Sequence, residues 1–133
     1  MDIIRIFLVD DHGVVRGGLG QMLELEEDME VVGEASNAEE ALAKVESLSP
    51  AIVLMDIKMP GTDGIELTRK IRGKYPSCNV IMFTLHDNYV AQAIEAGAAG
   101  YLLKDIRRAE LARAIRQVYH GQVVIGESIS YGP

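Results

Sequence analysis

The sequence predicts one α/β domain, a doubly wound parallel sheet of five strands covered by five helices. Short apolar runs alternate with amphipathic stretches five times along the 133 residues. This alternation is typical of β–α–β units, whose right-handed crossovers place helices on both faces of a sheet. The third run, residues 51–55, is apolar throughout, as expected of a strand buried on both faces. The common order for five such strands is 2-1-3-4-5.

The five strands are expected where apolar residues run between polar or turn residues. They cover residues 3–9, 30–35, 51–55, 79–84 and 99–103. The carboxyl ends of parallel strands meet at one edge of the sheet, so the polar residues that follow the strands gather there.

The first helix follows strand one and carries Val15, Leu19, Met22 and Leu23 at helical spacing. It also contains glycines at 17, 18 and 20. Each glycine costs about 1 kcal/mol relative to alanine inside a helix. We therefore expect either that packing compensates or that a close approach to the sheet requires small residues.

The remaining helices have recognisable ends. Residues 36–39 (Ser-Asn-Ala-Glu) predict a capping box before the second helix, and Pro50 stops that segment. Thr62 or Asp63 can cap the third helix, which ends near residues 75–77. The fourth follows residues 86–88 and closes at Gly97, and the fifth covers residues 107–120 and ends at Gly121. Residues 1–121 are thus predicted to form the domain, and 122–133 a linker or tail.

Composition limits the function classes. The net charge of -7 argues against direct nucleic-acid binding, since phosphate contacts need clustered Lys and Arg. Cys78 is the single cysteine, which favours a reducing compartment. No apolar run approaches the length of a membrane span. A soluble, cytoplasmic protein without membrane contact is expected.

Four of the predicted strand ends carry residues that can act together. Asp10 and Asp11 follow strand one, Asp56 strand three, Thr84 ends strand four, and Lys104 follows strand five. Three neighbouring carboxylates repel one another unless positive charge intervenes, which Lys104 and a divalent cation would supply. Mg²⁺ prefers oxygen ligands together with a phosphate. A carboxylate can also be the nucleophile, which yields an aspartyl phosphate.

Each of these residues taken singly has an ordinary interpretation. Asp10 or Asp11 could cap a helix, and Asp56 could be a turn residue. Thr84 could be a plain strand residue and Lys104 a solvated lysine. By the same reasoning Tyr101 fits strand packing, and His12 and His86 fit caps or surface positions rather than ligands. Only the joint placement at successive strand ends favours a functional site.

These residues resemble the receiver domain of two-component response regulators, up to about residue 120. The likeness is carried by Asp10-Asp11, by residues 55–61 (Met-Asp-Ile-Lys-Met-Pro-Gly), and by Thr84, Tyr101 and Lys104. Residues 11–16 and 100–105 further resemble the subclass usually followed by a LuxR-type helix-turn-helix. The resemblance implies a flavodoxin-like fold.

The resemblance also implies roles at the site. Asp56 would accept phosphate from a histidine kinase. Asp11 and Asp56, with the backbone carbonyl of Lys58, would bind Mg²⁺ directly, and Asp10 would act largely through water. Lys104 would pair with the phosphoryl oxygens. The domain would be a switch rather than an enzyme, with self-phosphorylation from small donors and self-dephosphorylation at most.

Signal output is implied in the same way. Thr84 would move to hydrogen-bond the phosphate, and Tyr101 would turn inward behind it. This shift would remodel the face made by helix four, strand five and helix five, and would promote a homodimer. Lys58 and His86 would flank the path of the hydrolytic water and tune the phosphate lifetime. DNA would be reached only through a transcriptional C-terminal domain absent from this chain.

One departure from the family pattern and three rivals remain. The segment from Thr84 to Lys104 is about two residues shorter than expected, which affects the loop after His86 and helix four. A haloacid-dehalogenase-like phosphohydrolase would need Asp-x-Asp, but Ile57-Lys58 follow Asp56. A pseudo-receiver that only binds partners is disfavoured by the intact residue set. The glycines at 13, 17, 18 and 20 form no nucleotide-binding pattern.

Overall fold

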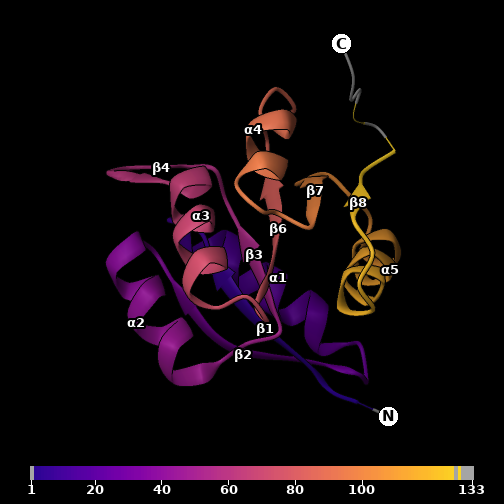
Figure 1. The fold of residues 1–133 in the computed structure, drawn as a ribbon. Coiled ribbons are helices and arrows are strands. Elements are labelled where there is room, and N and C mark those ends of the chain that lie inside the picture. Colours follow the sequence, from indigo (N-terminus) through magenta and orange to yellow (C-terminus); the bar gives the residue numbers. More distant parts are fainter. Residues whose placement is uncertain (1, 128, 130–133) are drawn as a thin grey trace.

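The computed structural model describes residues 2–127 and 129. Strands and helices alternate along the chain except after the third strand, where β4 (Lys58–Met59) and β5 (Thr62–Asp63) form a separate antiparallel pair. A parallel sheet of six strands has the order β2-β1-β3-β6-β7-β8 (Figure 1). The predicted order of five strands is confirmed, and a sixth strand is added at one edge. The sheet strands are β1 (Ile4–Val9), β2 (Met29–Ala35), β3 (Ile52–Met55), β6 (Asn79–Thr84), β7 (Gly100–Leu103) and β8 (Val124–Ile125). The helices are α1 (Gly13–Glu24), α2 (Ala38–Leu48), α3 (Gly64–Lys74), α4 (Val90–Glu95) and α5 (Arg108–Tyr119).

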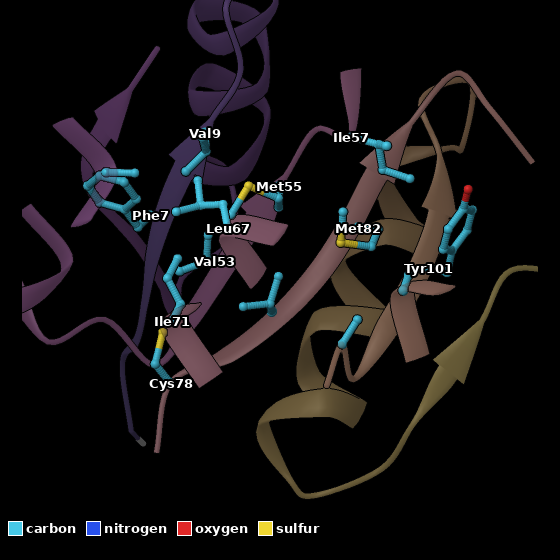
Figure 2. Packing of buried hydrophobic residues seen from close by; sticks show 14 of the residues in the cluster. Phe7, Val9, Val53, Met55, Ile57, Leu67, Ile71, Cys78, Met82 and Tyr101 are labelled. Atoms are coloured by element: carbon cyan, nitrogen blue, oxygen red, sulfur yellow. The ribbon is translucent and has the colours of Figure 1, made fainter. Parts of the chain in front are cut away.

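The sheet separates two apolar layers. Successive residues of β3 point to opposite faces: Val53 and Met55 join one cluster, and Ile52 and Leu54 the other. The first cluster is covered by α2, α3 and α4, and Figure 2 shows part of it around Leu67. The second cluster is covered by α1 and α5. Burial on both faces explains why β3 is apolar throughout.

The sixth strand lies where the sequence predicted a linker or tail. In β8, Val124 pairs with Gly100 and Ile125 with Tyr101 of β7. Ile129 is buried in the same cluster as Tyr101. A strand of two residues is too short to show a period, so sequence reasoning could not find it. Residues 128 and 130–133 of the predicted tail lie outside the described residues.

The helix caps partly follow the prediction. Asp63 caps α3, accepting from the backbone N–H of Ile65 at 2.9 Å. The expected capping box before α2 is shifted by one residue: Asn37 accepts from the N–H of Glu40, and the Glu40 carboxylate accepts from the N–H of Ser36. Asn37 is the N-cap residue because its side chain reaches the first turn of α2, whereas Ser36 still belongs to the segment that follows β2.

The glycines of α1 do not approach the sheet. A Cβ added at Gly17, Gly18 or Gly20 would meet nothing within 4 Å. The expectation of a close approach is therefore wrong, and packing holds the helix instead: Leu19 and Leu23 are buried against the sheet.

Helix α4 is the shortest helix in the described part of the chain, with six residues against twelve in α1 and α5. Tyr89 occupies its N-cap position, and Gly97 follows its end with φ +105°. None of the described helices combines the length and apolar character needed to cross a bilayer.

Candidate functional site

The carboxyl ends of four strands form the candidate site. The backbone N–H of Asp10 donates to Ala35 O at 3.1 Å, that of Asp56 to Val9 O at 3.0 Å, and that of Lys104 to Thr84 O at 2.8 Å. These bonds extend the sheet ladder by one residue beyond each strand. The side chains of Asp10, Asp56 and Lys104 are therefore positioned by the register of the sheet rather than by flexible loops.

The acidic groups converge as predicted. One ligand atom from each of Asp10, Asp11, His12 and Asp56 lies within 4.8 Å of the others. Lys104 Nζ lies 2.6 Å from Asp10 Oδ2 and 3.1 Å from Asp56 Oδ2, so a single ammonium bridges two carboxylates. The remaining negative charge of the cluster needs a further cation.

Asp10 and Asp11 have different surroundings, although they are neighbours in the sequence. Asp10 accepts from Lys104 and from the backbone N–H of His12, at 2.9 Å. Within the described residues, Asp11 Oδ1 is buried and makes no hydrogen bond of normal geometry, although His12 Nδ1 lies 3.2 Å from it. Neither carboxylate caps α1, since His12 holds the N-cap position without a side-chain cap bond. Asp10 is therefore committed to Lys104, and Asp11 remains available to a ligand.

Asp56 is buried, with 6% of its surface exposed. Its Oδ1 accepts from the N–H of Ile57 at 2.8 Å, and its Oδ2 faces Lys104. Burial raises the pKa of Asp56, and this outweighs the opposing charge of Lys104. For Lys104 burial acts the other way, but the hydrogen bond to Asp10 and the charges of Asp56 and Asp10 prevail and raise its pKa. Lys104 thus stays positively charged beside its two acids.

The residues present fit a hard divalent cation. Carboxylate oxygens are the ligands that Mg²⁺ prefers, and it commonly takes only one or two of them. Asp11 Oδ1 is a ligand atom of this kind, because it is buried without a hydrogen bond of normal geometry, which is costly for a carboxylate oxygen. Asp11 and Asp56 would hold the ion, with the Lys58 carbonyl as a predicted further ligand.

Gly64, the first residue of α3, shapes the backbone behind Asp56. Its N–H donates to Ile57 O at 2.8 Å. A Cβ on Gly64 would lie only 1.9 Å from the Asp56 carbonyl oxygen. The start of the helix can therefore pack directly against the backbone of Asp56 only because residue 64 has no side chain.

The predicted switch residues lie together behind the site. Thr84 is fully buried, and its Oγ1 accepts from the N–H of His86 at 3.2 Å. Tyr101 is also fully buried, and its hydroxyl donates to His86 O at 2.5 Å. Tyr101 thus already points inward in this structure. Both residues hold the segment after β6 through His86.

Lys58 and His86 meet at a residue that sequence reasoning did not single out. Lys58 Nζ lies 4.8 Å from the centre of the Tyr89 ring, a cation–π distance. The His86 ring meets the same tyrosine edge to face, with centroids 6.1 Å apart. The loop after β3 is thereby joined to the segment after β6 across the site.

Three residues of the site were missed from the sequence: His12, Gly64 and Tyr89. The sequence predicts His12 as a cap or surface residue, and His12 does hold the N-cap position of α1. Its Nδ1 also lies 3.2 Å from Asp10 Oδ1 and from Asp11 Oδ1. Its adjacency to Asp11 was the available signal. No sequence pattern marks the contacts of Gly64 or Tyr89, because both depend on loop conformation.

A pocket of about 530 Å³ opens over the site. Its lining includes the charged and polar residues Asp56, Lys58, His86 and Lys104. Apolar residues from α1, β6 and the following loop also line it. Four predicted site residues therefore face one cavity.

Fold and site together define an α/β domain with an acidic site at its strand ends, and the chain belongs to the family described as "Response regulator receiver domain", whose model matches residues 6–116. A relative is the response regulator GacA of Pseudomonas viridiflava, 42% identical over 130 residues, covering 96% of this chain and 61% of GacA. Another is the nitrate/nitrite response regulator protein NarL of Escherichia coli K12, 39% identical over 127 residues, covering 94% of this chain and 59% of NarL.

A solved structure confirms the architecture. The crystal structure of a LuxR-family two-component response regulator from Aurantimonas sp. SI85-9A1 matches with a TM-score of 0.91 and 38% identity, covering 96% of this chain and 93% of that one. The resemblance drawn from the sequence is therefore confirmed, and membership in this family disfavours the phosphohydrolase alternative. The chain spans about three fifths of the length of the curated relatives named above.

Proposed function

We propose that Asp56 is the phosphoacceptor of this receiver domain and that Mg²⁺, Lys104 and Thr84 support the transfer. The observation that carries the proposal is the contact of one ammonium, Lys104, with both Asp56 and Asp10, beside the buried oxygen of Asp11. A bound Mg²⁺ would neutralise charge on the phosphoryl oxygens. The donor is proposed to be a histidine kinase, as the family resemblance implies, acting in the cytoplasm.

The reaction needs alignment rather than acid–base chemistry. A carboxylate oxygen of Asp56 attacks phosphorus, and the bond from phosphorus to the donor's leaving group breaks. Lys104, now held between Asp10 and Asp56, lies within reach of the new phosphoryl oxygens. The fixed positions of these groups at the strand ends support this, because little reorganisation is required.

Readout is proposed to begin at Thr84. Its oxygen accepts from the N–H of His86, and its hydroxyl proton can still be donated. Turning this hydroxyl toward a phosphate would release His86 and the loop that leads into α4. The Tyr101 side chain already points inward. Its hydroxyl would keep the hydrogen bond to His86 O only if that carbonyl moved together with the loop. The face of α4, β7 and α5 would change in consequence.

The lifetime of the phosphate is proposed to depend on Lys58 and His86, which both touch Tyr89. Together they would screen the aspartyl phosphate from water. The domain would therefore be a switch whose only chemistry is its own phosphorylation and dephosphorylation. Contact with DNA would need a further domain, as the LuxR-family likeness suggests.

Incubation with acetyl phosphate and Mg²⁺ tests the phosphoacceptor. Intact-protein mass spectrometry should find one added phosphate, lost when Mg²⁺ is chelated and absent from Asp56→Asn. The exposed Asp105→Asn serves as the matched control and should be phosphorylated like the parent chain. A phosphate retained by Asp56→Asn would overturn the assignment. Steady turnover of a phosphomonoester would favour a hydrolase instead.

Sedimentation velocity tests the output. Loading with beryllofluoride, which mimics the phosphoryl group, should shift the chain toward a dimer through the α4–β7–α5 face. Asp56→Asn should stay unshifted under the same conditions. An unchanged sedimentation coefficient for the loaded parent chain would contradict phosphorylation-driven dimerisation.

A further inference from the structure

The pocket over Asp56 is larger and more apolar than a phosphoryl group requires. At about 530 Å³ it has the size of a small-molecule site. A water molecule takes about 30 Å³ of liquid volume, so a phosphoryl group and a hydrated ion would fill only part of the space. The rest of the pocket needs an occupant of its own.

The apolar residues that line the pocket, called the wall below, come from α1 and from the end of β6 with the loop behind it. Val15, Leu19 and Met22 line it from α1. Phe83 and Leu85 line it from the end of β6 and the loop behind it. Leu85 is 74% exposed, which is unusual for a large apolar side chain. The wall thus runs from the buried Leu19 and Phe83 to the exposed Leu85, and it lines the same pocket as Asp56.

The lining of the pocket combines two kinds of residue that together select one kind of ligand. Lys58 and Lys104 line it together with Asp56, where an anionic phosphoryl group belongs. The apolar wall lines the same pocket. An occupant with an anionic phosphoryl head and an apolar remainder satisfies both kinds at once.

We propose that this pocket binds the leaving group of small acyl phosphates that carry an aromatic or branched apolar group. Such donors would phosphorylate Asp56 more efficiently than acetyl phosphate does. The proposal rests on the proposed function, since it names the substrate class of the same acceptor. It adds a specificity wall, centred on Val15 and Leu85, to the catalytic groups.

The transfer balances without further reactants. A carboxylate oxygen of Asp56 forms a bond to phosphorus, and the bond from phosphorus to the acyl oxygen breaks. The electron pair leaves with that oxygen, so the product is the free carboxylate of the aromatic or branched acid. No proton, oxidant or reductant is consumed, and the leaving carboxylate then diffuses from the apolar wall.

The test compares benzoyl phosphate with acetyl phosphate as donors at saturating Mg²⁺. The rate of Asp56 phosphorylation is measured at several donor concentrations, and the efficiency ratio of the two donors is formed within each protein. Burial of one methylene-sized group is worth roughly a factor of four. A phenyl ring on the wall should therefore raise the ratio about tenfold or more, mainly through a lower KM.

One variant on α1 and one on the loop after β6 separate the effect of the wall from the reactivity of the donors. Val15→Thr makes the wall polar at nearly constant shape, and Leu85→Gln does so at the exposed rim. Both should lower the benzoyl-to-acetyl ratio severalfold. Val14→Thr is the matched control, because Val14 is 91% exposed and does not line the pocket, and its ratio should equal that of the parent chain. Benzylphosphonate should also inhibit phosphorylation by acetyl phosphate more strongly than methylphosphonate does.

Two kinds of failure are distinguishable. If neither donor phosphorylates Asp56, the proposed function itself fails. If both donors do, but the ratio is the same in the parent chain, Val15→Thr and Leu85→Gln, the acceptor stands and the specificity wall is overturned. The wall would then serve another occupant, such as an apolar surface of a protein donor.

Discussion

At the scale of single residues, Asp56 is held where its charge is unfavourable. Burial raises its pKa, so between the pKa of an unfolded aspartate, about 3.9, and its own higher value the folded chain binds more protons than the unfolded chain. The free energy of unfolding therefore falls as pH rises through this interval. At neutral pH the charged Asp56 therefore lowers the free energy of unfolding by its full amount, unless a bound cation offsets this loss.

Replacing Asp56 by Asn should therefore stabilise the metal-free protein at pH 7. We expect a gain of roughly 0.5–2 kcal/mol in the free energy of unfolding, the usual scale when a functional strain is relieved. The gain should vanish near pH 3, where the carboxyl is protonated in both states. Urea titration at both pH values measures it, and Mg²⁺ should then stabilise the parent chain more than the variant. A variant less stable than the parent at pH 7 would contradict this account.

The convergence of the candidate site residues could be predicted from the sequence because parallel strand ends share an edge. Asp10, Asp56 and Lys104 follow from that rule alone. Side-chain partnerships across loops do not, since they depend on rotamers and on loop conformation. The contact of Lys58 with Tyr89 could therefore be learned only from the structure.

At the scale of elements, the start of α3 limits what the acceptor loop tolerates. Gly64 lies against the Asp56 carbonyl, whereas a Cβ on Gly73 of the same helix would meet nothing within 4 Å. The two glycines look alike in the sequence, and helix propensity disfavours both. Their roles differ only through what surrounds them.

Alanine at these two positions should have opposite effects. Gly64→Ala forces backbone apart behind Asp56 and should lower the free energy of unfolding by roughly 1–3 kcal/mol, the scale of overpacking. Gly73→Ala should raise it by about 0.5–1 kcal/mol, because alanine loses less conformational entropy in a helix. Thermal unfolding of both variants measures the difference. Equal changes at the two sites would mean that α3 is not packed against the acceptor segment.

The elements themselves were largely predictable, because helical spacing and turn residues are local signals. The exceptions are informative. The glycines of α1 suggested a close approach that Leu19 and Leu23 render unnecessary. The two-residue strand β8 carries no local signal, since its partner Gly100 is far away in the sequence.

At the scale of the whole molecule, Arg116 joins the two ends of the fold. From α5 it donates to Asp28, with Nε to Oδ2 and Nη2 to Oδ1 both at 2.8 Å, and to Glu26 Oε1 at 2.7 Å. Both acids lie between α1 and β2, so this bidentate clamp fixes α5 against the N-terminal half. The hydrogen bond from Arg116 lowers the pKa of Asp28.

Removing the clamp should cost stability in a pH-dependent way. We expect Arg116→Gln to lower the free energy of unfolding at pH 7 by about 1 kcal/mol, as for a partly exposed charged network. A lowered pKa contributes stability above the pKa of an unfolded aspartate, and that stability is lost as pH falls through the folded pKa. The difference from the parent chain should therefore shrink toward pH 2. Arg113→Gln, on the exposed face of α5, should change little at either pH.

The sixth strand has a practical consequence for measuring the switch. β8 occupies the hydrogen-bonding edge of β7, the strand that carries Tyr101. A version of the protein trimmed at residue 121 would leave that edge bare, and bare edges pair with other chains. Such a version would associate whether or not Asp56 carried a phosphate, so its dimers would report on the trimming. The length at which the protein is prepared thus decides whether association can be read as a signal.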